Sequence, residues 1–142
     1  MRAVIDTNEL LRMAAALERS LLFSAWLNRR FEMVMSETLF AEFQQVCARP
    51  HARRFLRVIY LRRFVAVLRD RAMWIKPAVD ISIPRCRDPK DDIVIATAIA
   101  AHADFIVTND GDLHDPPLVA RLRDEYSICV VWPGEFLEAI RN

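Results

Sequence analysis

Glycine and cysteine are both scarce in this sequence, and their scarcity excludes several classes of protein. The only glycines among the 142 residues are Gly111 and Gly134. Phosphate-binding P-loops and the Rossmann dinucleotide fingerprint each need several closely spaced glycines, so both are excluded. Cys47, Cys86 and Cys129 are odd in number and widely spaced, which argues against a disulfide framework and against a zinc site.

Long hydrophobic runs are also missing. No apolar stretch approaches the roughly 20 residues that a membrane-spanning helix requires, and Asp6 interrupts the N-terminal apolar segment too early for a signal peptide. Apolar residues still make up 54% of the chain, enough for the core of one domain of ordinary size. We therefore expect a single soluble domain over residues 1–142, located in the cytoplasm and without a membrane partner.

Lysine is scarce as well, because 18 of the 20 basic residues are arginine. The net charge is only +1, yet residues 49–71 contain eight arginines and one acid, a local charge of +7. Such a segment suits a polyanionic substrate bound by its backbone, although Arg-rich helices also occur as ordinary solvated faces. The first four arginines of the segment are the candidates for this contact: Arg49, Arg53, Arg54 and Arg57.

Short apolar runs alternate with helical patterns along the chain. Strands that alternate with helices predict right-handed crossovers and a parallel sheet covered on both faces. The expected strands are Arg2–Ile5, Glu32–Met35, Phe105–Thr108 and Ile128–Val131. The expected helices include Glu37–Ala48, a helix with a buried stripe at Val58, Leu61, Val65, Leu68 and Ala72, and one from Asp88 to about His102.

Four acids lie at or near the ends of these apolar runs. Asp6 and Asp110 each follow an expected strand, whereas Glu42 and Asp92 lie in expected helices. Functional groups gather outside the carboxyl ends of strands in open α/β sheets, and hard divalent cations take carboxylate oxygens as ligands. A helix cap would also explain Asp6, but the cost of desolvating an acid after a buried strand favours a ligand. Glu42 taken alone is typical of the boundary of an amphipathic helix.

Three acids fall within the run Arg87–Asp92, and the expected helix gives them different roles. Asp88 has the position of an N-cap, and Asp91 has that of a capping-box acid near the positive end of the helix dipole. Asp92 precedes apolar residues at i+3, i+4 and i+7, so it shares their stripe and is expected to point inward. We predict that Asp92 is the metal ligand of this group.

The run Thr108–Asp112 follows the third expected strand and is polar throughout. Turn chemistry accounts for Asn109 and Gly111 but less well for the two acids beside them. Either Asp110 or Asp112 could bind a cation directly, with the other acid nearby but not bound to it.

Taken in order, these motifs resemble the PIN domain. The resemblance covers nearly the whole chain and is closest to the branch of toxin components of toxin–antitoxin systems, related to VapC-like ribonucleases. It implies a three-layer α/β/α fold around a central parallel sheet of about five strands. The resemblance rests on Asp6-Thr7-Asn8, on Ser36 with Glu42, on the run from Arg87 to Asp92 with Ala96, on Thr108 to Leu113, and on Pro133 to Leu137.

The family implies a Mg²⁺- or Mn²⁺-dependent endoribonuclease that hydrolyses RNA phosphodiesters with metal-activated water. Carried over by position, the catalytic acids are Asp6, Glu42, Asp92 and Asp110, of which Asp6, Asp92 and Asp110 hold the metal. Supporting roles fall to Thr7 or Asn8 beside Asp6, to Thr108 or Asn109 in the cleft, and to Asp112 as a nearby acid.

Two sets of residues stand apart from this pattern. Where relatives carry an apolar residue after the first motif, this chain has Glu9, which is either a fifth acid near the cleft or an exposed helix residue, and we expect it to be exposed. His51, His102 and His114 lie outside the matching motifs, so we interpret them as surface or core residues and not as general bases.

The resemblance also implies partners and leaves alternatives. The partners are an RNA substrate, a cognate antitoxin that wraps the apolar and Arg-rich helices, and a second copy in a homodimer. The main alternative is a non-catalytic PIN-like RNA-binding or scaffold module, against which the four acids argue. A phosphohydrolase of the haloacid-dehalogenase type needs an acid where Asn8 stands, and a receiver-like domain needs a lysine after a late strand, whereas Lys76 and Lys90 are the only lysines.

Overall fold

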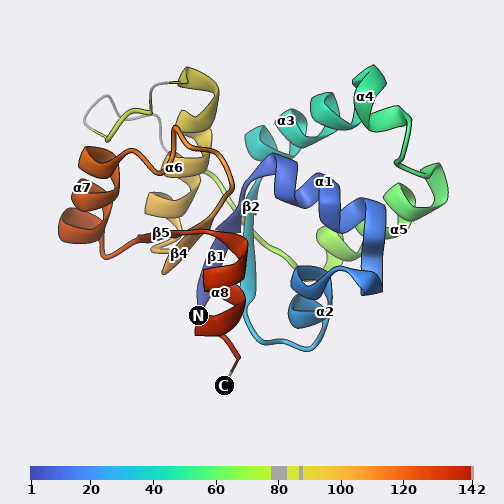
Figure 1. The fold of residues 1–142 in the computed structure, drawn as a ribbon, viewed down its shortest axis with the longest axis horizontal. Coiled ribbons are helices and arrows are strands. Elements are labelled where there is room, and N and C mark those ends of the chain that lie inside the picture. The colour runs from blue at the N-terminus through green and yellow to red at the C-terminus, as the bar shows by residue number, and fades with distance from the viewer. Residues whose placement is uncertain (78–82, 87, 142) are drawn as a thin grey trace.

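A five-stranded parallel sheet forms the centre of the protein in the computed structural model, which describes residues 1–77, 83–86 and 88–141 (Figure 1). The strand order is β3-β2-β1-β4-β5, and every neighbouring pair is parallel. Arg87, part of the predicted acidic motif, lies outside the described residues. The strands are β1 (Arg2–Ile5), β2 (Glu32–Ser36), β3 (Met73–Ile75), β4 (Phe105–Val107) and β5 (Cys129–Val131).

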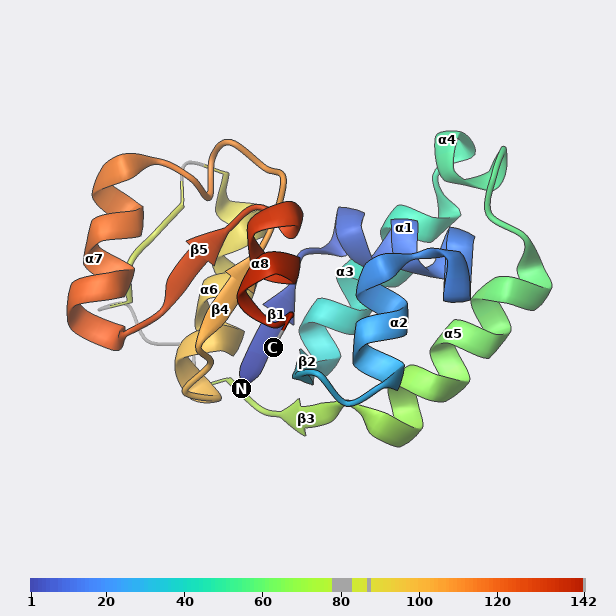
Figure 2. The same cartoon turned by 60° about the horizontal axis from the view of Figure 1, so that its bottom comes forward.

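Helices cover both faces of the sheet, which confirms the expected three-layer α/β/α architecture. Right-handed crossovers place α1 to α5 and α8 on one face and α6 and α7 on the other (Figures 1 and 2). The helices are α1 (Thr7–Ala16), α2 (Leu21–Leu27), α3 (Glu37–Ala48), α4 (Pro50–Arg53), α5 (Val58–Arg71), α6 (Asp92–Ala100), α7 (Pro116–Tyr126) and α8 (Pro133–Ala139), with short 3₁₀ turns η1 (Leu17–Arg19) and η2 (Pro89–Asp91). None of the helices in the described segments is long and apolar enough to span a bilayer.

Two elements differ from the sequence-based expectation. Strand β3 was not located, because its three half-buried residues at the sheet edge are too few for a periodic signal. The stripe predicted for α5 is also shifted: Phe64 and Leu68 are fully buried, whereas Val58 is 66% exposed. The middle and final turns of α5 supply its buried residues, so its first turn stays at the surface.

The strand order creates a crevice at one edge of the sheet. The chain leaves the neighbouring strands β1 and β4 in opposite directions across the sheet, so they form a topological switch point. In open α/β sheets, ligands bind outside the carboxyl ends of the strands at such a point. The last residues of β1, β4 and β5 are aligned in register, and therefore Asp6, Thr108 and Trp132 emerge beside one another at this edge.

Candidate metal centre

Asp6 is a buried carboxylate at the switch point. Asp6 is only 3% exposed, and its carboxylate accepts hydrogen bonds from Thr108 Oγ1 at 2.7 Å and from Thr7 Oγ1 at 3.4 Å. Burial raises the pKa of Asp6 above its ordinary value, the bond from Thr108 opposes this, and the nearby charge of Asp110 raises it further. The two hydroxyl groups thus hold the Asp6 carboxylate in one orientation, and no basic side chain among the described residues forms an ion pair with it.

The loop after β4 presents two more acids to the same crevice. The backbone N–H of Asp110 donates to Thr108 Oγ1 at 2.9 Å, and the N–H of Asp112 donates to Asp110 Oδ1 at 2.9 Å. Thr108 therefore ties the loop to Asp6 through a single hydroxyl group. These bonds fix Asp110 close enough to Asp6 for the two charges to interact.

The start of α6 contributes Asp91, and not Asp92, to this group of charges. The Asp91 carboxyl is hydrogen-bonded to Asp110, and burial, that bond and the charges of Asp110, Asp6 and Asp88 raise its pKa to about 8. Asp92 lies elsewhere: its Oδ1 accepts from the backbone N–H of Cys86 at 2.7 Å and its Oδ2 pairs with Arg85 at 3.4 Å. Asp92, which the sequence predicts to be a metal ligand, therefore has both carboxylate oxygens engaged by Cys86 and Arg85 in this structure.

The rotation of α6 explains this exchange of roles. The buried residues of α6 are Val94, Ile95, Thr97 and Ala98. Asp91 precedes Val94 by three residues and Ile95 by four, so it lies on the same face of the helix as they do. The sequence of α6 is apolar on nearly every side, and its pattern alone does not select between neighbouring faces.

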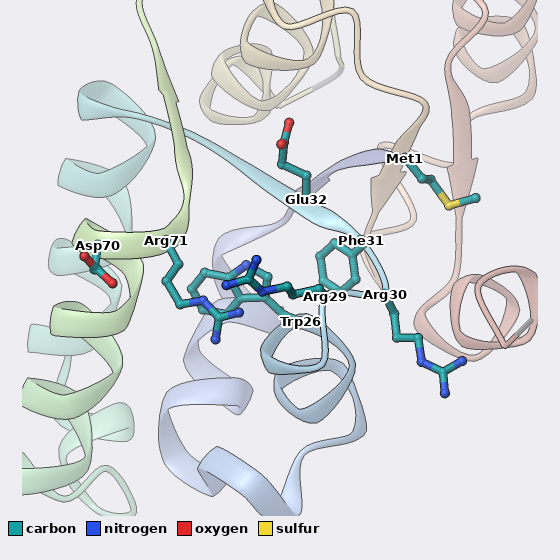
Figure 3. Close-up of a pocket in the computed structure, with 8 residues that line it drawn as sticks. All are labelled: Met1, Trp26, Arg29, Arg30, Phe31, Glu32, Asp70 and Arg71. Carbon is teal, nitrogen blue, oxygen red and sulfur yellow. The ribbon is translucent and has the colours of Figure 1, made fainter.

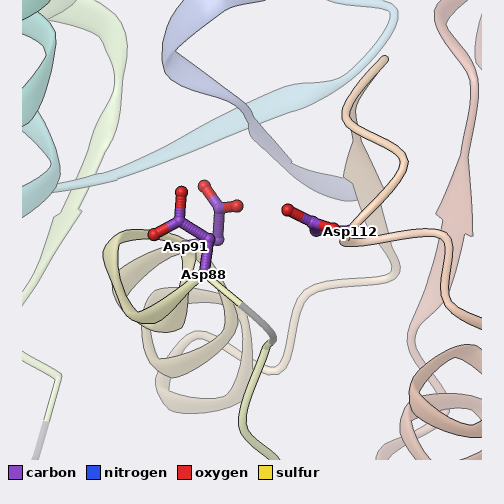
Figure 4. A group of neighbouring side chains, drawn as sticks. All are labelled: Asp88, Asp91 and Asp112. Carbon is purple, nitrogen blue, oxygen red and sulfur yellow. The ribbon is translucent and has the colours of Figure 1, made fainter.

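Asp88 and Asp112 complete the group. One carboxylate oxygen from each of Asp88, Asp91 and Asp112 lies within 4.8 Å of the other two, and Figure 4 shows the first two facing the third across the crevice. Asp88 also caps η2 by accepting from the N–H of Lys90 at 3.1 Å, as its position in the sequence predicted. We refer to Asp6, Asp88, Asp91, Asp110 and Asp112 as the acidic cluster.

The acidic cluster has the composition of a site for a hard cation. Its five members are all carboxylates, and among the described residues no lysine, arginine or histidine forms an ion pair with any of them. Desolvation and mutual repulsion raise the pKa values of Asp6 and Asp91. Mg²⁺ and Mn²⁺ prefer oxygen ligands and relieve such repulsion, so these residues fit a divalent cation.

The other predicted site residues have mixed surroundings. Thr7 and Thr108 contact Asp6 directly, whereas Asn8 is exposed. Glu42 is half-buried on α3, and no hydrogen bond or ion pair joins its side chain to the cluster or to any other residue in the described segments. The catalytic role of Glu42 stays a prediction.

Glu9 corrects an expectation from the sequence. It was expected to be exposed, but it is 4% exposed and pairs with Arg12 on the next turn of α1. Its Oε1 also accepts from Asn109 Nδ2 at 2.6 Å, which connects α1 to the loop carrying Asp110. Arg12 three residues later was the available signal, since a nearby cation compensates for burying the acid.

Replacing Glu9 with alanine is expected to lower the free energy of unfolding by about 1–3 kcal/mol, because a buried charge-assisted pair and the Asn109 bond are lost together. Urea denaturation would measure the change. Glu18→Ala is the matched control, since it removes an exposed partner of Arg63 and should leave stability nearly unchanged. Equal losses in the two variants would contradict the structural role of Glu9.

A separate depression of about 520 Å³ lies at the opposite edge of the sheet (Figure 3). Its lining includes Met1, which precedes β1, and Glu32, the first residue of β2, and it is rich in arginine. Two of these arginines hold main-chain carbonyl groups, Arg30 that of Arg141 and Arg71 that of Leu27. This depression lacks the gathered carboxylates of the acidic cluster and does not suit a hard cation.

Comparison with known proteins agrees with the fold. Residues 2–112 match the family model described as the PIN domain, a range that includes all five strand-end and helix-start acids of the cluster. Comparison with the curated proteins gives no match. Since the match spans well over half of the 142 residues, the chain belongs to the PIN domain family.

Proposed function

We propose that this protein is a Mg²⁺- or Mn²⁺-dependent endoribonuclease, the toxin of a toxin–antitoxin pair. PIN domains are typically metal-dependent nucleases, which makes hydrolysis of a phosphodiester the first expectation for the chain. The observation that carries the proposal is the acidic cluster at the carboxyl edge of β1 and β4, where a PIN fold opens its crevice. Asp6, Asp91 and Asp110 are the proposed principal ligands, with Asp88 and Asp112 beside them.

The chain's own groups prepare this site for a cation. A bound cation would supply activation of water and neutralisation of the charge that develops on the phosphate. Thr108 holds Asp6 and the loop of Asp110 in one arrangement, which lowers the cost of gathering ligands. Glu42 remains the proposed fourth catalytic acid.

The Arg-rich segment supports RNA as the substrate. Arg49, Arg53, Arg54 and Arg57 are exposed, and none of them forms an ion pair with an acid in the described part of the chain. Arg63 and Arg69, by contrast, are paired with Glu18 and Glu37. The four unpaired arginines remain available for phosphate groups along a strand.

An apolar groove supports the proposal of an antitoxin. The groove has a volume of about 570 Å³ and lies between α3 and α5, with Phe43, Cys47, Leu61 and Val65 among its lining. Val58 and the neighbouring Ile59 are 66% and 73% exposed beside it. An antitoxin helix with an apolar face and acidic flanks would match this groove and the nearby arginines. A second copy of the chain, in the proposed homodimer, is the competing occupant.

Cleavage of single-stranded RNA and of a folded tRNA would test the proposed activity. The purified protein is expected to cut RNA internally with Mg²⁺ or Mn²⁺ and to lose this activity in EDTA. Asp6→Asn should also lose it, because the substitution removes the charge that Thr108 orients. Failure of the folded wild-type protein to cut with either metal, while it still binds RNA, would favour the non-catalytic RNA-binding alternative.

A further inference from the structure

Trp132 is an exposed aromatic residue at the same edge of the sheet as the acidic cluster. It follows β5 directly and is 42% exposed. One face of its ring is stacked on the imidazole of His114, with ring centroids 3.6 Å apart and planes 6° apart. In the described segments His114 is the only aromatic ring stacked on Trp132, and a large part of the Trp132 residue stays accessible to a ligand.

Hydrogen bonds fix this pair relative to the acidic cluster. His114 Nε2 donates to the main-chain oxygen of Thr108 at 2.8 Å, because a carbonyl oxygen only accepts. The same Thr108 donates through Oγ1 to Asp6. On the other side, the backbone N–H of Trp132 donates to Glu135 Oε1 at 3.2 Å. Trp132 is therefore held by a short chain of contacts that ends at a proposed metal ligand.

The register of the sheet sets the distance between the two features. Asp6, Thr108 and Trp132 follow aligned residues on the adjacent strands β1, β4 and β5. Neighbouring strands lie about 4.8 Å apart, so the backbones of Asp6 and Trp132 are roughly 10 Å apart. One strand of substrate can thus contact the acidic cluster with a phosphate and Trp132 with a base.

We infer that Trp132, supported by His114, stacks against an unpaired base of the RNA bound at the acidic cluster. The inference rests on the proposed nuclease function. Flat aromatic surfaces beside a polar site are the means by which proteins bind single strands, since every base presents a π face. Trp132 is then a positioning residue, and it directs the site toward single-stranded segments, because bases in a duplex already stack on one another.

Binding by a cleavage-deficient protein tests the inference without relying on activity. In an Asp6→Asn background with Mg²⁺, anisotropy of a labelled single-stranded RNA would report the Kd. Trp132→Ala is expected to weaken binding by about 5- to 100-fold, and Trp132→Phe should restore part of the loss. Leu21→Ala is the control, because it truncates another exposed apolar side chain, at the start of α2, and should leave the Kd unchanged.

Tryptophan fluorescence gives a second readout that a merely structural residue would not provide. Trp26 is 3% exposed and Trp74 half-buried, so quenching by added RNA should come mainly from Trp132 and disappear in Trp132→Phe. Single-stranded RNA should quench more than a duplex of the same length.

The outcomes separate the inference from the proposed function. If wild-type protein cuts RNA and Trp132→Ala cuts and binds it equally well, the stacking role is wrong and the nuclease proposal stands. If wild-type protein neither binds nor cuts RNA, the nuclease proposal fails and the stacking role fails with it. If Trp132→Ala changes only the oligomeric state or the capture of an antitoxin, Trp132 belongs to a protein interface.

Discussion

Asp91→Asn is expected to reduce metal-dependent RNA cleavage by about 1,000-fold, whereas Asp92→Asn should retain activity within about tenfold of wild type. The reason is geometric. Asp91 interacts with Asp110 and with the charge of Asp6 inside the acidic cluster. Asp92 instead accepts from the N–H of Cys86 and pairs with Arg85, and an Asn side-chain oxygen can keep the first of these bonds.

Single-turnover cleavage at saturating metal would measure both variants, and metal titration would show whether the loss lies in affinity. Asp124→Asn is the matched control, because Asp124 is an exposed acid on α7 whose one ion pair among the described residues is with its neighbour Arg123. A loss in Asp92→Asn as large as that in Asp91→Asn would contradict the assignment. Wild-type activity in Asp91→Asn would remove Asp91 from the proposed ligands altogether.

Without metal, the protein is expected to lose stability as the pH rises from about 5 to about 8. The pKa of Asp91 is raised from 3.8 to about 8, first by burial and then by Asp110, Asp6 and Asp88. Between these values the folded state keeps a proton that the unfolded state releases, so each increase in pH favours unfolding. The contribution is fully present below the ordinary pKa and is lost as the pH passes through the raised one.

Asp91→Asn should therefore be more stable than wild type at pH 8 in the absence of metal, with a Tm higher by about 2–5 °C. The difference should shrink at pH 5, where Asp91 carries its proton. Added Mg²⁺ or Mn²⁺ should raise the Tm of wild type more at pH 8 than at pH 5, because binding at pH 8 displaces fewer protons. The variant should show little of this increase.

Thermal unfolding at the two pH values, with EDTA or with metal, would measure these changes, and Asp124→Asn again supplies the baseline for removing an acid. A metal-free Asp91→Asn protein that unfolds at a lower temperature than wild type at pH 8 would show that the Asp91 charge is not a source of repulsion.

Local patterns in the sequence located the strands that carry the site. Asp6 follows the first β-rich run directly and Asp110 lies shortly after the third, and the carboxyl ends of parallel strands share one edge, so both acids could be assigned to that edge. Asp88 was identified as a cap from Pro89 beside it, and the structure confirms that bond. These predictions needed only neighbouring residues and the handedness of crossovers.

The contact between Glu9 and Asn109 and the position of Trp132 could not be predicted in this way. Glu9 accepts a hydrogen bond from Asn109, a hundred residues later, and the position of Trp132 near Asp6 depends on the order of β1, β4 and β5. Neither distance in sequence nor residue type indicates these contacts.

Local sequence patterns predicted the alternation of strands and helices, the sheet edge where the acids gather, and a set of carboxylates there that suits a hard cation. Which acid at the start of α6 joins the cluster could not be predicted from these patterns and follows from the packing of the helix. Because α6 is apolar on nearly all sides, its rotation is set by packing on the sheet and by the buried bond of 3.0 Å between Thr97 and Ser36. That packing turns Asp91 toward Asp110 and Asp92 toward Cys86.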